Sequence, residues 1–180
     1  MHRVRRSVTS MFHDELDHHL VHDAPAPIFM GELPRDYGEL PATVVVNLCG
    51  VFPPSAPLGM VVFGLPLYDC LDPALAPRRE DIEAFLSAVH PIVGKSASYW
   101  HCHAGLNRSG IVLAAYLHLY RDMPISAAIR QLRERRSGMV LCNASFERML
   151  RTWYGQAHEQ AFEPVPMDRW LAERNGSFQP

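Results

Sequence analysis

The sequence predicts an α/β domain built on a central, mostly parallel sheet of four to five strands flanked by helices. Short runs of β-branched and aromatic residues alternate with longer segments whose apolar residues have helical spacing. The 180 residues are enough for one ordinary domain. With 48% hydrophobic residues, 20% charged residues and a net charge of -2, the composition is globular and excludes a nucleic-acid-binding polycation.

Four segments have the composition of short strands. They are Ile28–Met30, Thr43–Leu48, Met60–Leu65 and Ser98–Trp100. The second of them (TVVVNL) is β-branched throughout, which suits a strand buried on both faces. The fourth ends abruptly at His101.

Four further segments have helical spacing. They are Arg78–Val93, Ser109–Arg121, Ser126–Arg136 and Ala144–Tyr154. In the first, Ile82, Leu86 and Val89 fall on one side. The second has the apolar content of a buried helix and should stop before Pro124, while Gly155 is well placed to end the last.

The two ends of the chain are polar, and we expect the folded domain to cover residues 25–158. Residues 1–24 form a histidine-rich segment with a short helix around Met11–Val21, and residues 159–180 form a tail. The segment contains His13, His18, His19 and His22, and on such a helix i, i+3 and i, i+4 spacing would suit a metal site, although a solvated segment is the better interpretation. No apolar run reaches the roughly 18 residues of a membrane span.

The four cysteines are widely spaced and form no CxxC pair. They are Cys49, Cys70, Cys102 and Cys142. A zinc site or a disulfide scaffold is therefore not expected, and reduced thiols predict a cytoplasmic protein.

The segment from His101 to Gly110 (HCHAGLNRSG) lies between a predicted strand and a predicted helix. At such a junction the backbone N–H groups converge and the helix dipole favours an anion. Gly105 gives the backbone freedom that a tight cradle needs, and Arg108 adds a planar fork that can hold two phosphate oxygens. A thiol at the mouth of the cradle, that of Cys102, should have its pKa lowered from ~8.5 to roughly 4–7.

These residues predict a phosphatase that works through a phosphocysteine. Cys102 would attack phosphorus while Arg108 and the loop amides hold the equatorial oxygens. Ser109 can donate to the sulfur as it leaves, and His101 would support the cysteine from below. The mechanism needs no cofactor and no metal.

The leaving oxygen needs a proton, so a carboxylic acid should lie near the loop. The candidates are Asp69 and Asp72, in the segment LPLYDCLD. As a solvated loop residue or as the cap of the next turn, either aspartate would have no catalytic role.

The pattern His101-Cys102, Gly105, Arg108-Ser109 matches HCxxGxxR[ST] and resembles the protein tyrosine phosphatase superfamily. The apolar-Pro-apolar-x-Asp stretch ahead of the loop resembles the dual-specificity branch, which implies that Asp69 is the general acid and Asp72 the reserve. The likeness extends over about residues 25–155, and it implies a dual-specificity phosphatase-like fold.

The resemblance also implies which residues meet the substrate. In the loop these are His103, Ala104, Gly105, Leu106 and Asn107. Arg133 matches a family position that can face the cleft. The loop has no lysine, which disfavours phosphoinositides, so the expected substrate is phosphotyrosine in a protein or peptide, with phosphoserine and phosphothreonine as further substrates.

Two alternatives stay open. The run from Gly105 to Gly110 (GLNRSG) also resembles RNA 5'-triphosphatases of the same superfamily, so an RNA 5' end is a second candidate substrate. A non-catalytic phosphate-binding module is a candidate of another class. Several arginines could form a basic rim for an acidic peptide or RNA, or could pair with Glu134 and Glu147 on solvated helix faces. They are Arg130, Arg133, Arg135, Arg136, Arg148 and Arg151.

Cys49 follows a predicted inner strand, where related phosphatases carry a cysteine that can form a reversible disulfide with the nucleophile. The resemblance therefore implies an oxidised Cys49–Cys102 pair, with Cys70 as a second candidate partner. A small core cysteine is an equally good interpretation of Cys49.

Overall fold

The computed structural model describes residues 18–52, 56–70 and 72–155. Its strands are β1 (His18–His22), β2 (Ile28–Gly31), β3 (Val44–Asn47), β4 (Val61–Gly64) and β5 (Ser98–His101). Its helices are α1 (Arg79–Val93), α2 (Arg108–Tyr120), α3 (Ile125–Arg135) and α4 (Ala144–Trp153), with short 3-10 turns η1 (Tyr37–Glu39) and η2 (Pro73–Leu75).

The strands form one sheet in the order β1-β2-β5-β3-β4. The pairs β2–β5, β5–β3 and β3–β4 are parallel, while β1 pairs antiparallel with β2 at the edge. The predicted α/β architecture with a mostly parallel sheet is therefore confirmed. The central strands β3 and β5 are in register, so that Asn47 lies beside His101 at their carboxyl ends.

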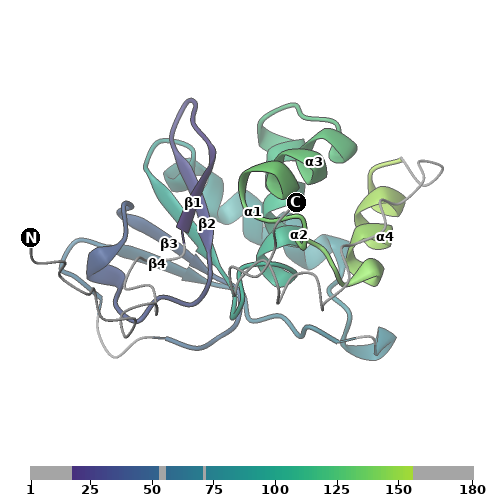
Figure 1. The fold of residues 1–180 in the computed structure, drawn as a ribbon, viewed down its shortest axis with the longest axis horizontal. Helices are drawn as coiled ribbons and strands as arrows, with labels where there is room; N and C mark the ends of the chain where they lie inside the picture. The colour runs from purple at the N-terminus through teal and green to yellow at the C-terminus, as the bar shows by residue number, and fades with distance from the viewer. Residues whose placement is uncertain (1–17, 53–55, 71, 156–180) are drawn as a thin grey trace, which may run out of the picture.

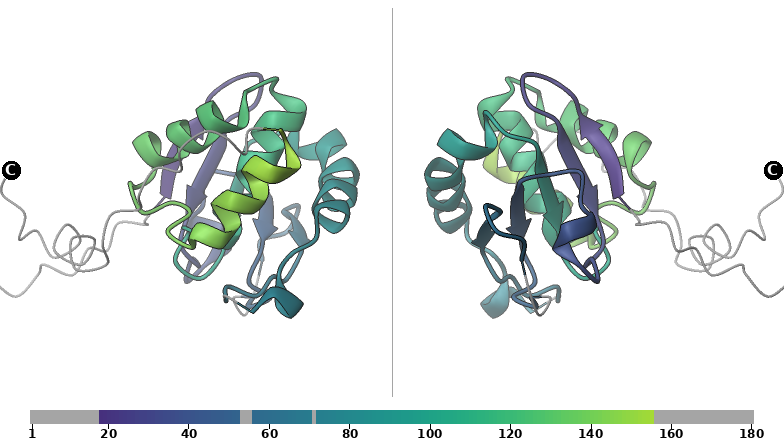
Figure 2. Two further views of the ribbon diagram at one scale, coloured as in Figure 1. Left: turned by 90° about the vertical axis from the view of Figure 1, so that its right-hand side faces the viewer. Right: turned by 90° about the vertical axis from the view of Figure 1, so that its left-hand side faces the viewer.

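The helices cover one face of the sheet, as the two opposite views of Figure 2 show, with α4 in front of α2 in the left-hand view. Strand residues such as Val44, Val46 and Trp100 point into the main core with the apolar side of α1. The other face carries a smaller cluster in which Val45 and Tyr99 pack against η1. Alternate residues of β3 thus enter two different cores, which explains why its sequence is apolar at every position.

Helix α2 fills the centre of the main core (Figure 1). Every residue from Ser109 to Leu117 is buried, as expected for a helix that is apolar on all sides. The strand before α2 and the helix itself therefore hold the intervening loop from within the core.

The N-terminal expectation needs a correction. Residues 18–22 form strand β1 and not the end of a helix, and the sheet therefore begins before Pro25. The strand has register shifts, and its side chains are mostly polar, so its only fully buried residue is Val21. The rest of the predicted helix lies outside the described residues. Among the described helices, none is long and apolar enough to cross a membrane.

Candidate active site

The predicted cysteine loop connects the carboxyl end of β5 with the first turn of α2. Its first residue, His101, ends the strand, and Arg108 begins the helix. The sequence-based placement of the loop at a strand–helix junction is therefore correct. Because β5 and α2 are buried on all sides, the loop has a rigid support at both ends.

Cys102 lies at the bottom of this loop with only 1% of its surface exposed. Burial alone would raise the pKa of its thiol, but the net pKa is lowered by the hydroxyl and N–H of Ser109, the N–H of Leu106 and the charge of Arg108. Its sulfur lies 3.4 Å from the Ser109 hydroxyl oxygen. The loop thus favours a thiolate at Cys102, which is the nucleophilic form.

The first turn of α2 has no side-chain cap. Asn107 occupies the N-cap position in a helical conformation, and its side chain makes no capping hydrogen bond. The N–H groups of a helix start need partners, and without a cap they can receive an anion. The departure from ordinary capping therefore suits an oxyanion site.

Arg108 reaches from the start of α2 toward the segment after β4. Its Nη1 donates to the Leu67 carbonyl over 3.4 Å, while its buried Nε has no hydrogen-bond partner among the described residues. A buried guanidinium donor without a partner is costly. An oxyanion held in the loop would satisfy it.

His101 is fully buried and belongs to a hydrogen-bonded chain that the sequence analysis did not predict. Burial lowers its pKa to about 4, so the imidazole is neutral near pH 7. Its Nδ1 lies 3.2 Å from the Cys102 carbonyl and its Nε2 lies 3.0 Å from the Tyr37 hydroxyl, which accepts a hydrogen bond from Asn47 over 3.1 Å. Because a neutral imidazole can donate from Nδ1 and accept at Nε2, Tyr37 completes the support of the loop.

Gly105 lies close against the backbone at the end of β2. It has a φ of +64°, and a Cβ there would overlap the carbonyl group of Gly31 at the end of β2. The glycine therefore fixes the loop against β2. Backbone freedom is the reason that the sequence suggests for a glycine at this point of the loop, and the structure gives a second reason, since any side chain would overlap Gly31.

The remaining loop positions differ in exposure. His103 is exposed, while Leu106 is only 6% exposed and packs in the core. The carbonyl of His103 accepts from Leu33, and that of Ala104 accepts from Arg136 over 3.4 Å. Of these side chains, that of His103 is the most exposed to an approaching substrate.

The two candidate acids have different surroundings. Asp69 is exposed and accepts hydrogen bonds from the side-chain amides of Asn107 and Asn143, each over 3.1 Å. Asp72 instead accepts from the Ala74 backbone N–H over 2.9 Å at the start of η2. Asp69 is therefore linked directly to the cysteine loop, whereas Asp72 has the role of a turn residue.

A cleft of about 630 Å³ lies beside the loop. Its lining includes Cys49, Leu67, Tyr68, Asp69 and Arg108. The candidate acid and the candidate phosphate-binding arginine thus face the same cleft. The half-buried Cys49 faces it too. Because Cys49 and Cys102 are both free thiols in this structure, their predicted disulfide stays a prediction.

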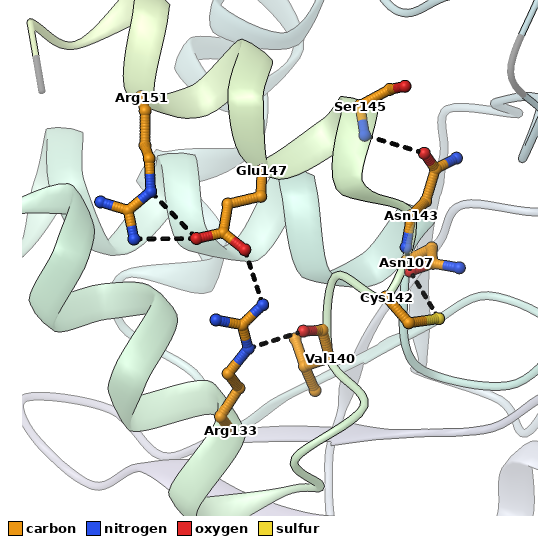
Figure 3. Close-up of polar contacts among 8 residues, drawn as sticks. All are labelled: Asn107, Arg133, Val140, Cys142, Asn143, Ser145, Glu147 and Arg151. Carbon is orange, nitrogen blue, oxygen red and sulfur yellow. Dashed lines mark hydrogen bonds and ion pairs between the residues drawn. The ribbon is translucent and has the colours of Figure 1, made fainter. Parts of the chain in front are cut away.

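Arg133, which we expected to contact the substrate, has a different environment. Its Nη2 donates to Glu147 over 2.7 Å and its Nε to the Val140 carbonyl over 3.0 Å, as Figure 3 shows. Arg151 binds the other oxygen of Glu147 through two of its nitrogens. Since Glu147 is 2% exposed, this is a buried structural ion pair network, and the substrate role predicted for Arg133 is not supported.

The predicted basic rim is correspondingly smaller. Arg133 and Arg151 lie inside the fold, whereas Arg130, Arg135 and Arg148 are exposed. Arg136 links β1 to the loop. Its Nη1 lies 3.0 Å from Nδ1 of His19, and its Nη2 donates to the Ala104 carbonyl. Half of the six arginines are thus on the surface.

The histidines of the N-terminal segment do not form a metal site within the described residues. No group of three or more His, Cys, Asp or Glu side chains there could hold a metal ion. His18, His19 and His22 lie on a strand, so helical spacing does not apply to them, and His13 lies outside the described residues.

Comparison with known proteins gives a single family. The dual specificity phosphatase, catalytic domain, matches residues 64–156. The tyrosine-protein phosphatase yvh1 of Schizosaccharomyces pombe is 36% identical over 78 residues, which are 43% of this chain and 23% of that protein. The match therefore spans less than a quarter of that relative's length.

Solved structures share the fold. A mouse dual specificity phosphatase crystallised with zinc tungstate superposes with a TM-score of 0.66 at 22% identity, over 83% of this chain and 93% of the other. Human DUSP28 superposes with a TM-score of 0.61 at 20% identity, over 77% of this chain and 93% of the other. At these identities the likeness concerns the fold alone.

Proposed function

Because the chain belongs to the dual specificity phosphatase family, we propose that it hydrolyses phosphomonoesters of proteins, phosphotyrosine in particular, through a phosphocysteine on Cys102. The observation that carries the proposal is the environment of Cys102. A buried thiol has its pKa lowered by Ser109, by the Leu106 amide and by the charge of Arg108, all groups of the same loop or of the helix start that follows it. The same donors would hold the phosphate and activate the nucleophile.

In the first step the Cys102 thiolate attacks phosphorus and the bond from phosphorus to the leaving oxygen breaks. The uncapped start of α2 and the guanidinium of Arg108, whose buried Nε needs a partner, would bind the equatorial oxygens. The leaving oxygen takes the proton of Asp69, so that an alcohol or phenol departs.

In the second step a water molecule attacks the phosphocysteine. The Asp69 carboxylate takes the proton from that water, the S–P bond breaks, and inorganic phosphate and the thiolate are released. The Ser109 hydroxyl, 3.4 Å from the sulfur, would donate a hydrogen bond to the departing thiolate. Ser109 is therefore proposed to assist the second step as well as the first.

The RNA 5'-triphosphatase alternative rested on Leu106 and Asn107. In the structure Leu106 is a core residue, and the Asn107 amide binds Asp69 and Asn143, so both have explanations that need no RNA. An acid beside the loop favours esters with a poor leaving group, because phosphate leaves well without a proton. Phosphoprotein substrates are therefore our first proposal and the RNA 5' end the second.

The proposal is tested with p-nitrophenyl phosphate, phosphotyrosine and phosphothreonine peptides, and 5'-triphosphate RNA, assayed side by side. We expect turnover of the phosphoesters, loss of turnover in Cys102→Ser, and a phosphorylated Cys102 peptide after acid quench and mass spectrometry. Tungstate, the oxyanion in the mouse structure, should compete with substrate. Turnover by Cys102→Ser at the parent rate would refute the nucleophile, and cleavage of RNA alone would favour the second proposal.

A further inference from the structure

Asp69 is held by side chains, not by regular secondary structure. It lies in the segment between β4 and η2, and it is exposed. Its Oδ2 accepts from Nδ2 of Asn107 and its Oδ1 from Nδ2 of Asn143, both over 3.1 Å. The two donors are the residues at the N-terminal ends of two helices, Asn107 at the start of α2 and Asn143 at the start of α4.

The orientation of the Asn107 amide is determined by its other contacts. Its Oδ1 accepts from the backbone N–H of Asn143 over 2.9 Å, and from the thiol of Cys142 over 3.3 Å (Figure 3). Burial raises the pKa of Cys142, so the thiol stays protonated and acts as the donor. Because a backbone N–H can only donate, the oxygen of Asn107 must face it, and the NH2 group must face Asp69.

The orientation of the Asn143 amide is determined in the same way. Asn143 is the N-cap of α4, and its Oδ1 accepts from the backbone N–H of Ser145 over 3.2 Å. Its NH2 group therefore points outward, to Asp69 and to the Cys70 carbonyl at 3.3 Å. Asn107 thus lies at the end of the cysteine loop and Asn143 at the start of α4. Each directs its NH2 group, which can only donate, toward the Asp69 carboxyl group.

We propose that Asn107 and Asn143 form an amide clamp that positions the Asp69 carboxyl group for proton transfer to the leaving oxygen. This inference rests on the proposed function. Each carboxyl oxygen accepts one hydrogen bond from the clamp, which fixes the plane of the group. Each oxygen keeps another lone pair that can carry the transferred proton. Asn107 and Asn143 are therefore positioning residues, and they act through Asp69.

The test uses two substrates that differ in their need for an acid. p-Nitrophenolate leaves readily without a proton, whereas the phenolate of phenyl phosphate does not. General acid catalysis contributes about 10²–10⁴-fold, so Asp69→Asn should lower kcat/KM by about 100-fold or more for phenyl phosphate and much less for p-nitrophenyl phosphate. Asn107→Ala should show the same selectivity with a smaller loss, about 10-fold or more.

Asn143→Ser separates the clamp from helix capping. Serine can still accept from the N–H groups of α4, but it has no NH2 group for Asp69. We expect the same selective loss for phenyl phosphate with unchanged thermal unfolding. Gln131→Ala is a matched control, because this amide donates to Val21 over 2.7 Å on the side of β1, and the ratio of the two rates should stay at the parent value.

A double-mutant cycle completes the test. If the clamp acts only through Asp69, Asn107→Ala should cause no further loss in an Asp69→Asn background. An equal loss for both substrates, or a full additional loss in that background, would overturn the clamp and make Asn107 a residue of the phosphate loop. A parent protein that hydrolyses neither substrate would instead refute the proposed function, so the two failures are distinguishable.

Discussion

Removal of Glu147 should destabilise the domain severely, because one carboxylate holds two buried arginines. Its side chain is 2% exposed, and those of Arg133 and Arg151 are 9% and 8% exposed. Hydrogen bonds to charged groups contribute about 1.5–3 kcal/mol each. The loss of one partner from a buried ion pair costs about 3–5 kcal/mol, because the remaining charge stays buried without compensation.

The magnitude can be compared with the stability of an ordinary domain, about 5–15 kcal/mol. Glu147→Ala could therefore leave little folded protein, so Glu147→Gln is the more useful variant. It keeps one acceptor oxygen but loses the charge and the acceptor that faces the other arginine, so we expect a loss of about 2 kcal/mol, the value of one hydrogen bond to a charged group. With an m-value of about 2 kcal/mol/M, the urea midpoint should fall by about 1 M.

The control for this measurement is Asp81→Asn. Asp81 and Arg78 form an ion pair of 2.7 Å, but their side chains are 48% and 73% exposed, so water and salt screen it. We expect no measurable change in the urea midpoint. A shift below about 0.3 M for Glu147→Gln, or equal shifts for both variants, would refute the argument from burial.

Three other predictions concern the cysteine loop. Ser109→Ala removes a donor to the Cys102 sulfur and should raise the pKa of that thiol, so the pH profile of iodoacetate inactivation should move to higher pH; an unchanged profile would contradict this. His101 has a pKa of about 4 when folded, against about 6.5 unfolded. The unfolded chain therefore takes up a proton between these values, and stability should fall by about 3 kcal/mol as the pH drops from 6.5 to 4, a loss that should be absent in His101→Asn. Peroxide, in converting Cys102 to a sulfenic acid, should lead to a Cys49–Cys102 disulfide that dithiothreitol reverses, and a sulfonic acid at Cys102 without any linked peptide would exclude it.

The cysteine loop could be predicted from the sequence because its parts are consecutive. Residues 101–110 include the proposed nucleophile, the glycine and the arginine, and the strand before them and the helix after them have clear patterns. The environment of Cys102 also comes from residues nearby in the sequence, since its hydrogen-bond donors, Leu106 and Ser109, belong to the same short segment.

The residues that hold the loop and the acid in place could not be predicted from spacing. Tyr37 and His101 are 64 positions apart, and Asn143 and Asp69 are 74 positions apart. A tyrosine after the second strand and an asparagine before the last helix have no local feature that indicates a partner. Arg133 shows the converse, since a plausible substrate arginine proved to bind Glu147, 14 positions away.

Strand β1 was missed for a related reason. An edge strand needs a buried side chain only where it faces a neighbouring element, and Val21 is the one fully buried residue in HHLVH. Its backbone pairing with β2 and its contact with Gln131 of α3 determine its conformation. Neither contact requires apolar residues at alternate positions. The segment therefore lacks the alternation that indicates a strand, and its histidines suggested a polar helix instead.

The two halves of the site should also differ in local stability. Cys102 lies in the main core between β5 and α2, whereas Asp69 is exposed and depends on two amide hydrogen bonds. Segments with few buried contacts open with a smaller free energy than the core does. In urea below the global unfolding midpoint, the hydrolysis of phenyl phosphate should therefore decline before that of p-nitrophenyl phosphate, which needs the nucleophile more than the acid. If both rates fall together with the loss of tryptophan fluorescence, the acid and the nucleophile unfold as one unit and this reasoning is wrong.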